Sequence, residues 1–272
     1  MMRPKAILFD MGGVLLDSVD DWDAQGFPIS FPEGLPDPAP LDWFLGMSQE
    51  ILSRFSALPV PRRAMEVRPI IETWLRKRQV APTPELVERW YEILCGWEAS
   101  PVYGFVRPTL ETLRDMGFRL GVISNTLMPA KRIRWRFDEA GISGLFEFTV
   151  FSAEFGVNKP DPAIFRHALD SMALDARDAW YVGDKPNRDV CGAHSVGMTA
   201  VLVDSVHHKH INDAPENVPD LRIKDISELP GLLKTLTRGA WAEATPCVRP
   251  DSRKNEAPSG NMEFMERGGT GI

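Results

Sequence analysis

The sequence predicts an α/β fold: a doubly wound parallel sheet interrupted by an inserted all-helical segment. From Arg107 onward, short apolar runs of strand length alternate with amphipathic helical patterns. Such repetition is typical of a parallel sheet covered by helices on both faces. A first apolar run, at residues 6–9, lies far ahead of the others, and the stretch between them has helical periodicity alone.

The predicted strands are short apolar runs bounded by turn residues. The first, at residues 6–9, precedes Asp10 and a Gly-Gly pair, which indicates a buried strand that stops abruptly. The others are expected at residues 120–123, 146–151, 180–182, 199–203 and 221–223.

The helices predicted between these strands have ordinary start and stop signals. Proline stands in the first turn of the first helix, glycine follows the first, second and fourth, and Asp161 precedes Pro162 as N-cap of the third. These helices are expected at residues 108–116, 129–140, 161–172, 188–196 and 226–236.

Residues 17–103 break the alternation. Residues 27–40 are rich in proline and glycine and predict a loop. Amphipathic patterns then predict helices at residues 41–55, 62–79 and 84–97. Five of the eight tryptophans of the chain fall in this segment: Trp22, Trp43, Trp74, Trp90 and Trp97. We expect them to fill the core of a small helical bundle; the alternative is that one or two line a substrate cleft.

These patterns divide the chain into three parts. Residues 1–16 and 104–238 are expected to form an α/β core domain, and residues 17–103 a helical domain inserted into it. Residues 239–272 are rich in proline, glycine, serine and charge without a sustained period, so we expect a disordered tail.

Composition excludes some classes of partner. The chain of 272 residues has a net charge of -7, so no basic excess exists to attract nucleic acid or an anionic membrane surface. Cys95, Cys191 and Cys247 are odd in number and widely spaced, which indicates reduced thiols and a cytoplasmic protein. No signal-peptide or membrane-spanning run is apparent. We expect a monomer or a homodimer.

Polar residues follow the predicted strand ends in an informative set. Asp10 follows the first strand, Ser124 ends the second, and Asp184 follows the fourth, with Asp189 five positions later. Lys159 precedes the helix after the third strand. Since the carboxyl ends of parallel strands lie on one edge of a sheet, these side chains are expected to converge there.

This set has a chemical logic. Several carboxylates together repel one another unless a cation sits among them, and oxygen ligands alone suit Mg²⁺. A magnesium ion, a lysine, a hydroxyl and backbone N–H groups form a cradle for a phosphoryl group. An aspartate aimed at phosphorus acts as a nucleophile. Ordinary alternatives remain: Ser124 as a turn former and Lys159 as a solvated surface lysine.

The four motifs, in this order, resemble those of the haloacid dehalogenase (HAD) superfamily of hydrolases, from Ala6 to about Val203. The helical insertion resembles the C1-type cap of that family. The resemblance implies that Asp10 is both nucleophile and Mg²⁺ ligand, and that the backbone carbonyl of Gly12 is a second metal ligand. It implies that Asp184 binds Mg²⁺ directly and that Asp189 orients that ligand or a metal-bound water.

The same resemblance assigns the phosphate-binding residues. Ser124 and the backbone N–H of Asn125 would hold phosphate oxygens. Lys159 would neutralise both the nucleophile and the phosphoryl charge. The function implied is a Mg²⁺-dependent phosphatase that acts on a small phosphorylated metabolite through an aspartyl-phosphate, with the cap selecting the substrate.

Gly12 departs from the usual pattern of the family. Most phosphatases of the superfamily have a second aspartate there, which protonates the leaving oxygen and then activates water. General acid–base catalysis is typically worth ~10² to 10⁴-fold, so a leaving group of low pKa, such as a sugar 1-phosphate or an acyl phosphate, suits Gly12 better than an alkyl ester. Asp17 is an alternative acid.

Two rival functions remain. Dehalogenases of the superfamily attack carbon without a metal, and Asp184 and Asp189 count against that activity. A catalytically weak binding or regulatory protein is the other, and the loss of the acid at Gly12 supports it. The intact charged cluster counts against it, because such clusters are costly to keep.

Overall fold

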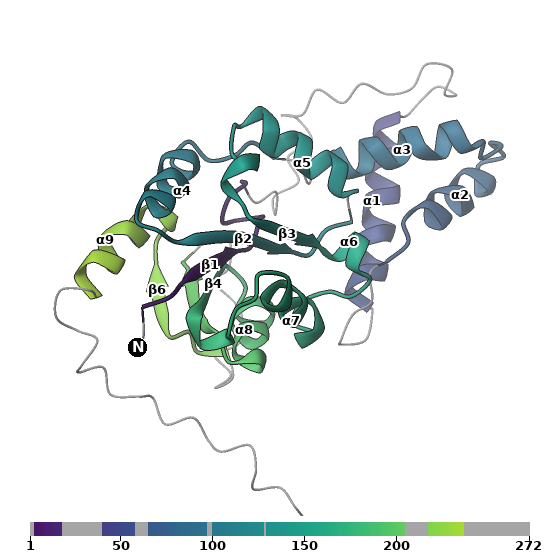
Figure 1. Cartoon of the computed structure of the whole chain (residues 1–272). Helices are drawn as coiled ribbons and strands as arrows, with labels where there is room; N and C mark the ends of the chain where they lie inside the picture. Colours follow the sequence, from purple (N-terminus) through teal and green to yellow (C-terminus); the bar gives the residue numbers. More distant parts are fainter. Residues whose placement is uncertain are drawn as a thin grey trace, which may run out of the picture.

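The computed structural model describes residues 3–17, 40–57, 65–96, 100–127, 129–204 and 217–236. Six parallel strands form one sheet in the order β3-β2-β1-β4-β5-β6 (Figure 1). Their bounds are β1 Ala6–Phe9, β2 Arg119–Ser124, β3 Phe148–Phe151, β4 Ala179–Gly183, β5 Thr199–Val203 and β6 Leu221–Ile223. The predicted parallel sheet is confirmed.

Helices cover both faces of the sheet. In Figure 1, α4 (Val106–Asp115), α5 (Ala130–Glu139) and α9 (Leu229–Thr235) lie on one side of it, and α7 (Pro162–Ser171) and α8 (Cys191–Val196) on the other. Short helical segments complete the connections: η1 Ser143–Leu145, α6 Ser152–Phe155, η2 Ala176–Asp178, η3 Pro186–Val190 and η5 Ile226–Glu228.

The alternation of side chains along β1 explains the two layers. Ile7 and Phe9 pack into the cluster beneath α4, α5 and α9, whereas Ala6 and Leu8 pack into the cluster beneath α7 and α8. All four are fully buried, as expected for a central strand of a doubly wound sheet.

Among the described residues, three helices lie between β1 and α4 in the chain: α1 (Pro40–Ala57), α2 (Arg68–Lys77) and α3 (Pro84–Gly96). Figure 1 shows them together at one end of the sheet. Trp74 and Trp90 are buried, and the ring of Trp43 packs edge-on against Trp74 and stacks on Trp90. The core-filling role predicted for tryptophan is therefore confirmed for Trp74 and Trp90, whereas Trp43 is partly buried against them.

The prediction was wrong about the start of α2. The expected helix began at residue 62, whereas α2 begins at Arg68 with Pro69 in its first turn. Proline lacks the N–H that a helix interior requires and is tolerated only in the first turn, so Pro69 marks a helix start. Smaller shifts of one to two residues occur at the ends of most other elements.

Several expectations fall on residues outside the described ranges. These are the loop predicted at 27–40, except Pro40 itself, where α1 begins; Trp22 and Trp97; and the tail at 239–272.

The two connections between the sheet and the inserted helices lie side by side. The backbone N–H of Asp17 donates to the carbonyl of Pro101, and that of Tyr103 donates to the carbonyl of Leu15, each at 3.1 Å. Leu16 and Val102 thus form an antiparallel bridge.

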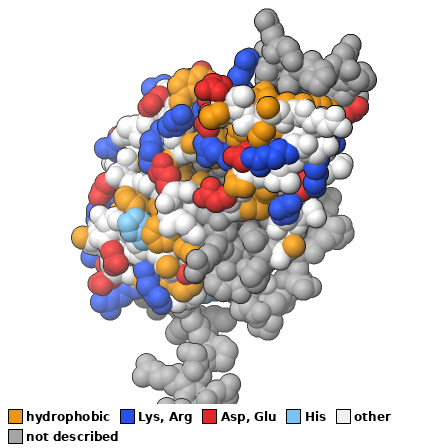
Figure 2. All heavy atoms as spheres, turned by 90° about the vertical axis from the view of Figure 1, so that its right-hand side faces the viewer, with side chains coloured by type: hydrophobic (Ala, Val, Ile, Leu, Met, Phe, Trp, Pro, Cys, Tyr) orange, Lys and Arg blue, Asp and Glu red, His pale blue; other side chains and the backbone are white. Residues whose placement is uncertain are grey.

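Side chains of both charges are mixed on one face of the molecule. Figure 2 shows Lys and Arg side chains among Asp and Glu side chains on the face that includes the inserted helices. Among the described residues, no helix is both long and apolar enough to cross a bilayer.

Candidate active site

The carboxyl ends of β1, β2 and β4 bring the predicted residues together. Phe9 pairs in register with Val122 of β2 and with Val182 of β4, so Asp10 emerges between these two strands. The backbone N–H of Asp10 continues the pairing by donating to the carbonyl of Val182 at 2.8 Å. The sheet changes winding direction here, which is where α/β proteins place ligands.

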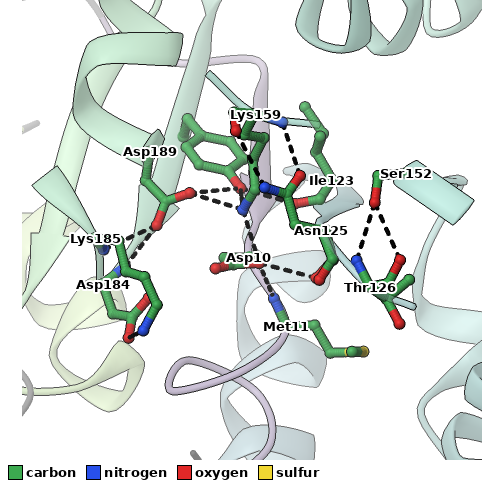
Figure 3. Close-up of polar contacts among 12 residues, drawn as sticks. Asp10, Met11, Ile123, Asn125, Thr126, Ser152, Lys159, Asp184, Lys185 and Asp189 are labelled. Carbon is green, nitrogen blue, oxygen red and sulfur yellow. Dashed lines mark hydrogen bonds and ion pairs between the residues drawn. The ribbon is translucent and has the colours of Figure 1, made fainter. Parts of the chain in front are cut away.

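Three donors converge on one oxygen of Asp10 (Figure 3). Its Oδ1 accepts the backbone N–H of Met11 at 2.7 Å and the hydroxyl of Ser124 at 3.0 Å, and it lies 2.8 Å from the Nζ of Lys159. The side chain is nearly buried. These contacts hold the carboxylate in one orientation, and none of the three engages Oδ2.

Lys159 is buried among polar partners. Its ammonium group, 2.8 Å from Asp10, also lies 2.7 Å from Oδ1 of Asp189 and 2.8 Å from the hydroxyl of Tyr181. The alternative of a solvated surface lysine is wrong, because Lys159 is only 2% exposed. Tyr181 in turn donates to the carbonyl of Ile123 at 2.7 Å.

Asp189 lies in the turn η3 and organises the end of β4. Its Oδ2 accepts the backbone N–H groups of Asp184 and Lys185, at 3.1 and 2.9 Å. Both of its oxygens therefore take donors, since Oδ1 receives Lys159. Gly183 makes this possible: a Cβ there would stand 2.3 Å from the Cβ of Asp189.

The carboxylate of Asp184 lies against Gly13. A Cβ at Gly13 would stand 2.5 Å from Oδ2 of Asp184, and the φ of Gly13, +75°, is one that other residues rarely adopt. The Nζ of Lys185 is 3.5 Å from the same oxygen. The Gly-Gly pair after Asp10 thus lets the buried carboxylate of Asp184 approach the end of β1.

The loop after β2 is held by side-chain bonds. The Oδ1 of Asn125 accepts the backbone N–H of Lys159 at 2.7 Å, and its Nδ2 donates to the carbonyl of Lys159 at 3.1 Å. The hydroxyl of Ser152 accepts from the backbone N–H of Thr126 at 3.0 Å and donates to its carbonyl at 3.2 Å (Figure 3). Both polar atoms of the Asn125 side chain therefore bind the backbone of Lys159.

Burial and like charges set the protonation of the cluster. Burial raises the pKa of Asp10 to about 6; Lys159 opposes the rise, and Asp189 and Asp184 add to it. Burial alone would lower the pKa of Lys159, but Asp10 and Asp189 outweigh it and raise that pKa. Burial, then the charges of the three aspartates, raises the pKa of Tyr181 well above its usual value, so its hydroxyl remains a donor.

Three carboxylates of the site suit a divalent cation. Oxygens of Asp10, Asp184 and Asp189 lie within 4.8 Å of one another, and all three residues are buried. They face the ammonium groups of Lys159 and Lys185, which leaves one negative charge in excess. A buried excess charge of this kind, on oxygen donors alone, fits Mg²⁺.

The space around Gly12, where the sequence lacks the second aspartate, is open. A Cβ on Gly12 would meet no atom within 4 Å among the described residues, and the φ of Gly12 is not positive. Asp17, the alternative acid, is exposed, and its Oδ1 accepts the hydroxyl of Tyr103 at 3.0 Å. Asp17 thus takes part in the paired connections instead of joining the carboxylate cluster.

Sequence patterns missed three polar contributors. Tyr181 lies within an apolar strand and there resembles any β-forming aromatic residue. Ser152 begins a short helix, and Lys185 stands between two motif residues. Nothing in the sequence pattern distinguishes these three residues from ordinary strand, turn or surface residues.

The chain is similar in sequence to known hydrolases. The model of the haloacid dehalogenase-like hydrolase family matches residues 4–197. A glyceraldehyde 3-phosphate phosphatase of Methanopyrus kandleri is 34% identical over 50% of this chain and 58% of its own. A phosphoserine phosphatase of Thermus thermophilus is 34% identical over 47% and 50%. The chain thus spans between half and three fifths of these first curated relatives.

Longer matches have lower identity. A phosphoglycolate phosphatase of Mannheimia succiniciproducens is 28% identical over 83% of this chain and 96% of its own. Among solved structures, a 2-haloacid dehalogenase from Pseudomonas syringae has a TM-score of 0.62 and 26% identity, over 85% of this chain and 99% of that one. A magnesium-bound HAD-hydrolase from Bacillus subtilis shares the fold, with a TM-score of 0.57 and 17% identity over 85% and 99%.

Proposed function

Because the chain belongs to the haloacid dehalogenase-like hydrolases, we propose that it is a Mg²⁺-dependent phosphatase of a small phosphorylated metabolite. The convergence of Met11, Ser124 and Lys159 on Asp10, beside two further buried carboxylates, carries this proposal. Relatives named as phosphatases of glyceraldehyde 3-phosphate, phosphoserine and phosphoglycolate support a small phosphate ester as substrate.

In the proposed reaction, a carboxylate oxygen of Asp10 forms a bond to phosphorus, and the bond from phosphorus to the leaving oxygen breaks. The leaving oxygen departs with the electron pair and takes a proton from solvent. A water oxygen then bonds to phosphorus, and the bond from phosphorus to the Asp10 oxygen breaks. Inorganic phosphate leaves, the water proton passes to solvent, and the Asp10 carboxylate is restored. Ser124 and the N–H of Asn125 would hold phosphoryl oxygens, and Lys159 would stabilise their charge.

The residues proposed to hold the cation are Asp10, Asp184 and the backbone carbonyl of Gly12. Bound there, a magnesium ion supplies positive charge opposite the phosphoryl oxygens. Asp189 would orient Asp184 instead of ligating, since its two oxygens already accept Lys159 and the N–H groups at the end of β4. Gly13 contributes by leaving room for the Asp184 carboxylate.

The glycine at position 12 restricts the kind of leaving group that the proposed substrate carries. No carboxylic acid stands at this position to protonate the leaving oxygen, and Asp17 is engaged by Tyr103. We therefore infer a preference for a leaving group of low pKa, such as that of a sugar 1-phosphate or an acyl phosphate, over an alkoxide.

The likeness to a 2-haloacid dehalogenase structure favours one rival function. That reaction needs a nucleophilic carboxylate, which Asp10 supplies, but it gives no role to a buried cluster of three carboxylates. A catalytically weak binding protein would have the same difficulty, because buried charges are costly unless they serve a ligand. A cytoplasmic location and the monomer or homodimer stay predictions.

The test is hydrolysis of p-nitrophenyl phosphate and 2-chloropropionate, each with Mg²⁺ or with EDTA. The proposal expects Mg²⁺-dependent release of nitrophenol, no chloride release, and loss of turnover in Asp10→Asn but not in Asp115→Asn, an exposed position on α4. Chloride release without phosphatase activity would establish the dehalogenase. Inactivity toward both compounds would reject the proposal that this protein is an enzyme.

A further inference from the structure

The loop that follows Ser124 is held by three different parts of the chain. Asn125 exchanges hydrogen bonds with the backbone of Lys159, and Thr126 exchanges them with the hydroxyl of Ser152. Leu127 is held through its carbonyl, which accepts the hydroxyl of Tyr91 at 2.6 Å. A loop outside the strand ladder must satisfy its backbone groups elsewhere, and here the third partner comes from the inserted helices.

The hydroxyl of Tyr91 is fixed in place by its surroundings. Tyr91 lies on α3 and is 5% exposed. The guanidinium of Arg68, on α2, lies 3.9 Å from the centroid of its ring. Two hydrogen bonds, at 2.8 and 3.1 Å, hold Arg68 to Glu88, one turn before Tyr91 on α3. The phenol therefore reaches Leu127 from a buried position on α3, with its ring against Arg68.

A neighbouring contact joins the same helix to the sheet domain without touching the loop. Glu92, the residue after Tyr91, pairs with Arg132 of α5 at 2.8 Å, and both side chains are about two-fifths exposed. Exposed pairs contribute little to stability. This pair thus provides a matched control, because it joins α3 to the sheet domain but leaves the carbonyl of Leu127 alone.

We infer that Tyr91 is a positioning residue of the active site: by binding the carbonyl of Leu127, it fixes the loop that presents Ser124 and the N–H of Asn125 to phosphate. The inference rests on the proposed phosphatase function. It means that the inserted helices contribute a contact that holds the phosphate-binding loop. Docking of α3 and the geometry of this loop are then coupled.

The experiment compares Tyr91→Phe with Glu92→Gln, using p-nitrophenyl phosphate and saturating Mg²⁺. Phenylalanine keeps the ring beneath Arg68 and removes only the hydroxyl. One lost hydrogen bond predicts a kcat about 3- to 10-fold lower in Tyr91→Phe, with KM within twofold of the wild type. Amide hydrogen exchange over residues 125–127 should accelerate by a similar factor, with the rest of the sheet unchanged. Glu92→Gln should match the wild type in both measurements.

The outcomes separate this inference from the proposed function. If Tyr91→Phe has the kcat and the amide exchange of the wild type, the inference about Tyr91 is overturned and the proposed phosphatase function is unaffected. Equal losses in Glu92→Gln would also overturn it, because any loosening of α3 would then suffice. If the wild type is inactive, exchange alone still tests the contact. If Tyr91→Phe unfolds, Arg68→Ala replaces it, and faster exchange confined to residues 125–127 is expected.

Discussion

Replacing Asp10 by Asn should stabilise the metal-free protein at neutral pH. The pKa of this carboxyl is about 6 in the folded protein and 3.8 in the unfolded chain, chiefly because burial disfavours the charged form. Asparagine has nearly the same shape, and its Oδ1 can still accept from Met11, Ser124 and Lys159. The substitution thus removes a buried charge at little cost in hydrogen bonding.

The sign follows from the order of the two pKa values. Between pH 3.8 and about 6 the folded protein keeps a proton that the unfolded chain has lost. Stability from the protonated carboxyl is therefore complete below pH 3.8 and is lost as the pH rises through about 6. A shift of this size corresponds to about 3 kcal/mol at pH 7 and about 1 kcal/mol at pH 4.5. The advantage of Asp10→Asn should shrink accordingly on acidification.

Urea unfolding in EDTA at pH 4.5 and pH 7 measures this difference, with the exposed Asp115→Asn as control. The control should stay close to the wild type, because its side chain is exposed. Adding Mg²⁺ should reverse the order at pH 7, since the wild type gains binding free energy that Asp10→Asn cannot match. A metal-free Asp10→Asn less stable than the wild type at pH 7, or an advantage that does not change with pH, would refute the reasoning.

Three further substitutions test the site. Gly12→Asp fits the open space and should raise turnover of an alkyl phosphate by about 10-fold or more, while turnover of p-nitrophenyl phosphate changes little. Equal effects on the two substrates would contradict the role given to the pKa of the leaving group. Gly13→Ala places a Cβ 2.5 Å from Oδ2 of Asp184, at a backbone φ of +75°. The affinity for Mg²⁺, measured by calorimetry, should therefore fall at least about 10-fold, whereas Gly12→Ala should bind Mg²⁺ as the wild type does. Tyr181→Phe leaves the Ile123 carbonyl without its donor and should lower the free energy of unfolding by about 1 to 3 kcal/mol in urea; an unchanged value would show that water replaces the hydroxyl.

The edge of the sheet where the site lies was predictable because strand patterns are local. Four buried apolar residues before Asp10 and the apolar run before Asp184 predict two strand ends, and the βα alternation predicts that the strands are parallel. Parallel topology then requires that these ends share one edge. No distance between the residues was needed for this step.

Other features depend on contacts that no local pattern contains. The Asn125 side chain binds the backbone of Lys159, 34 positions away, and Tyr91 binds Leu127, 36 positions away. An asparagine in a loop and a tyrosine on a helix have many ordinary roles, so their residue types give no hint of these partners. The start of α2 was a different failure, since Pro69 marked it in the sequence itself.

The paired connections at Leu16 and Val102 have a consequence for how the chain tolerates variation. The inserted segment begins and ends at adjacent, hydrogen-bonded residues. It is therefore attached to the sheet domain in the same way as the loop of a hairpin is attached to its two strands. Loop-closure entropy grows only slowly with length once the two ends are joined. The junction therefore tolerates inserts of different size with little change in the register of β1 and β2.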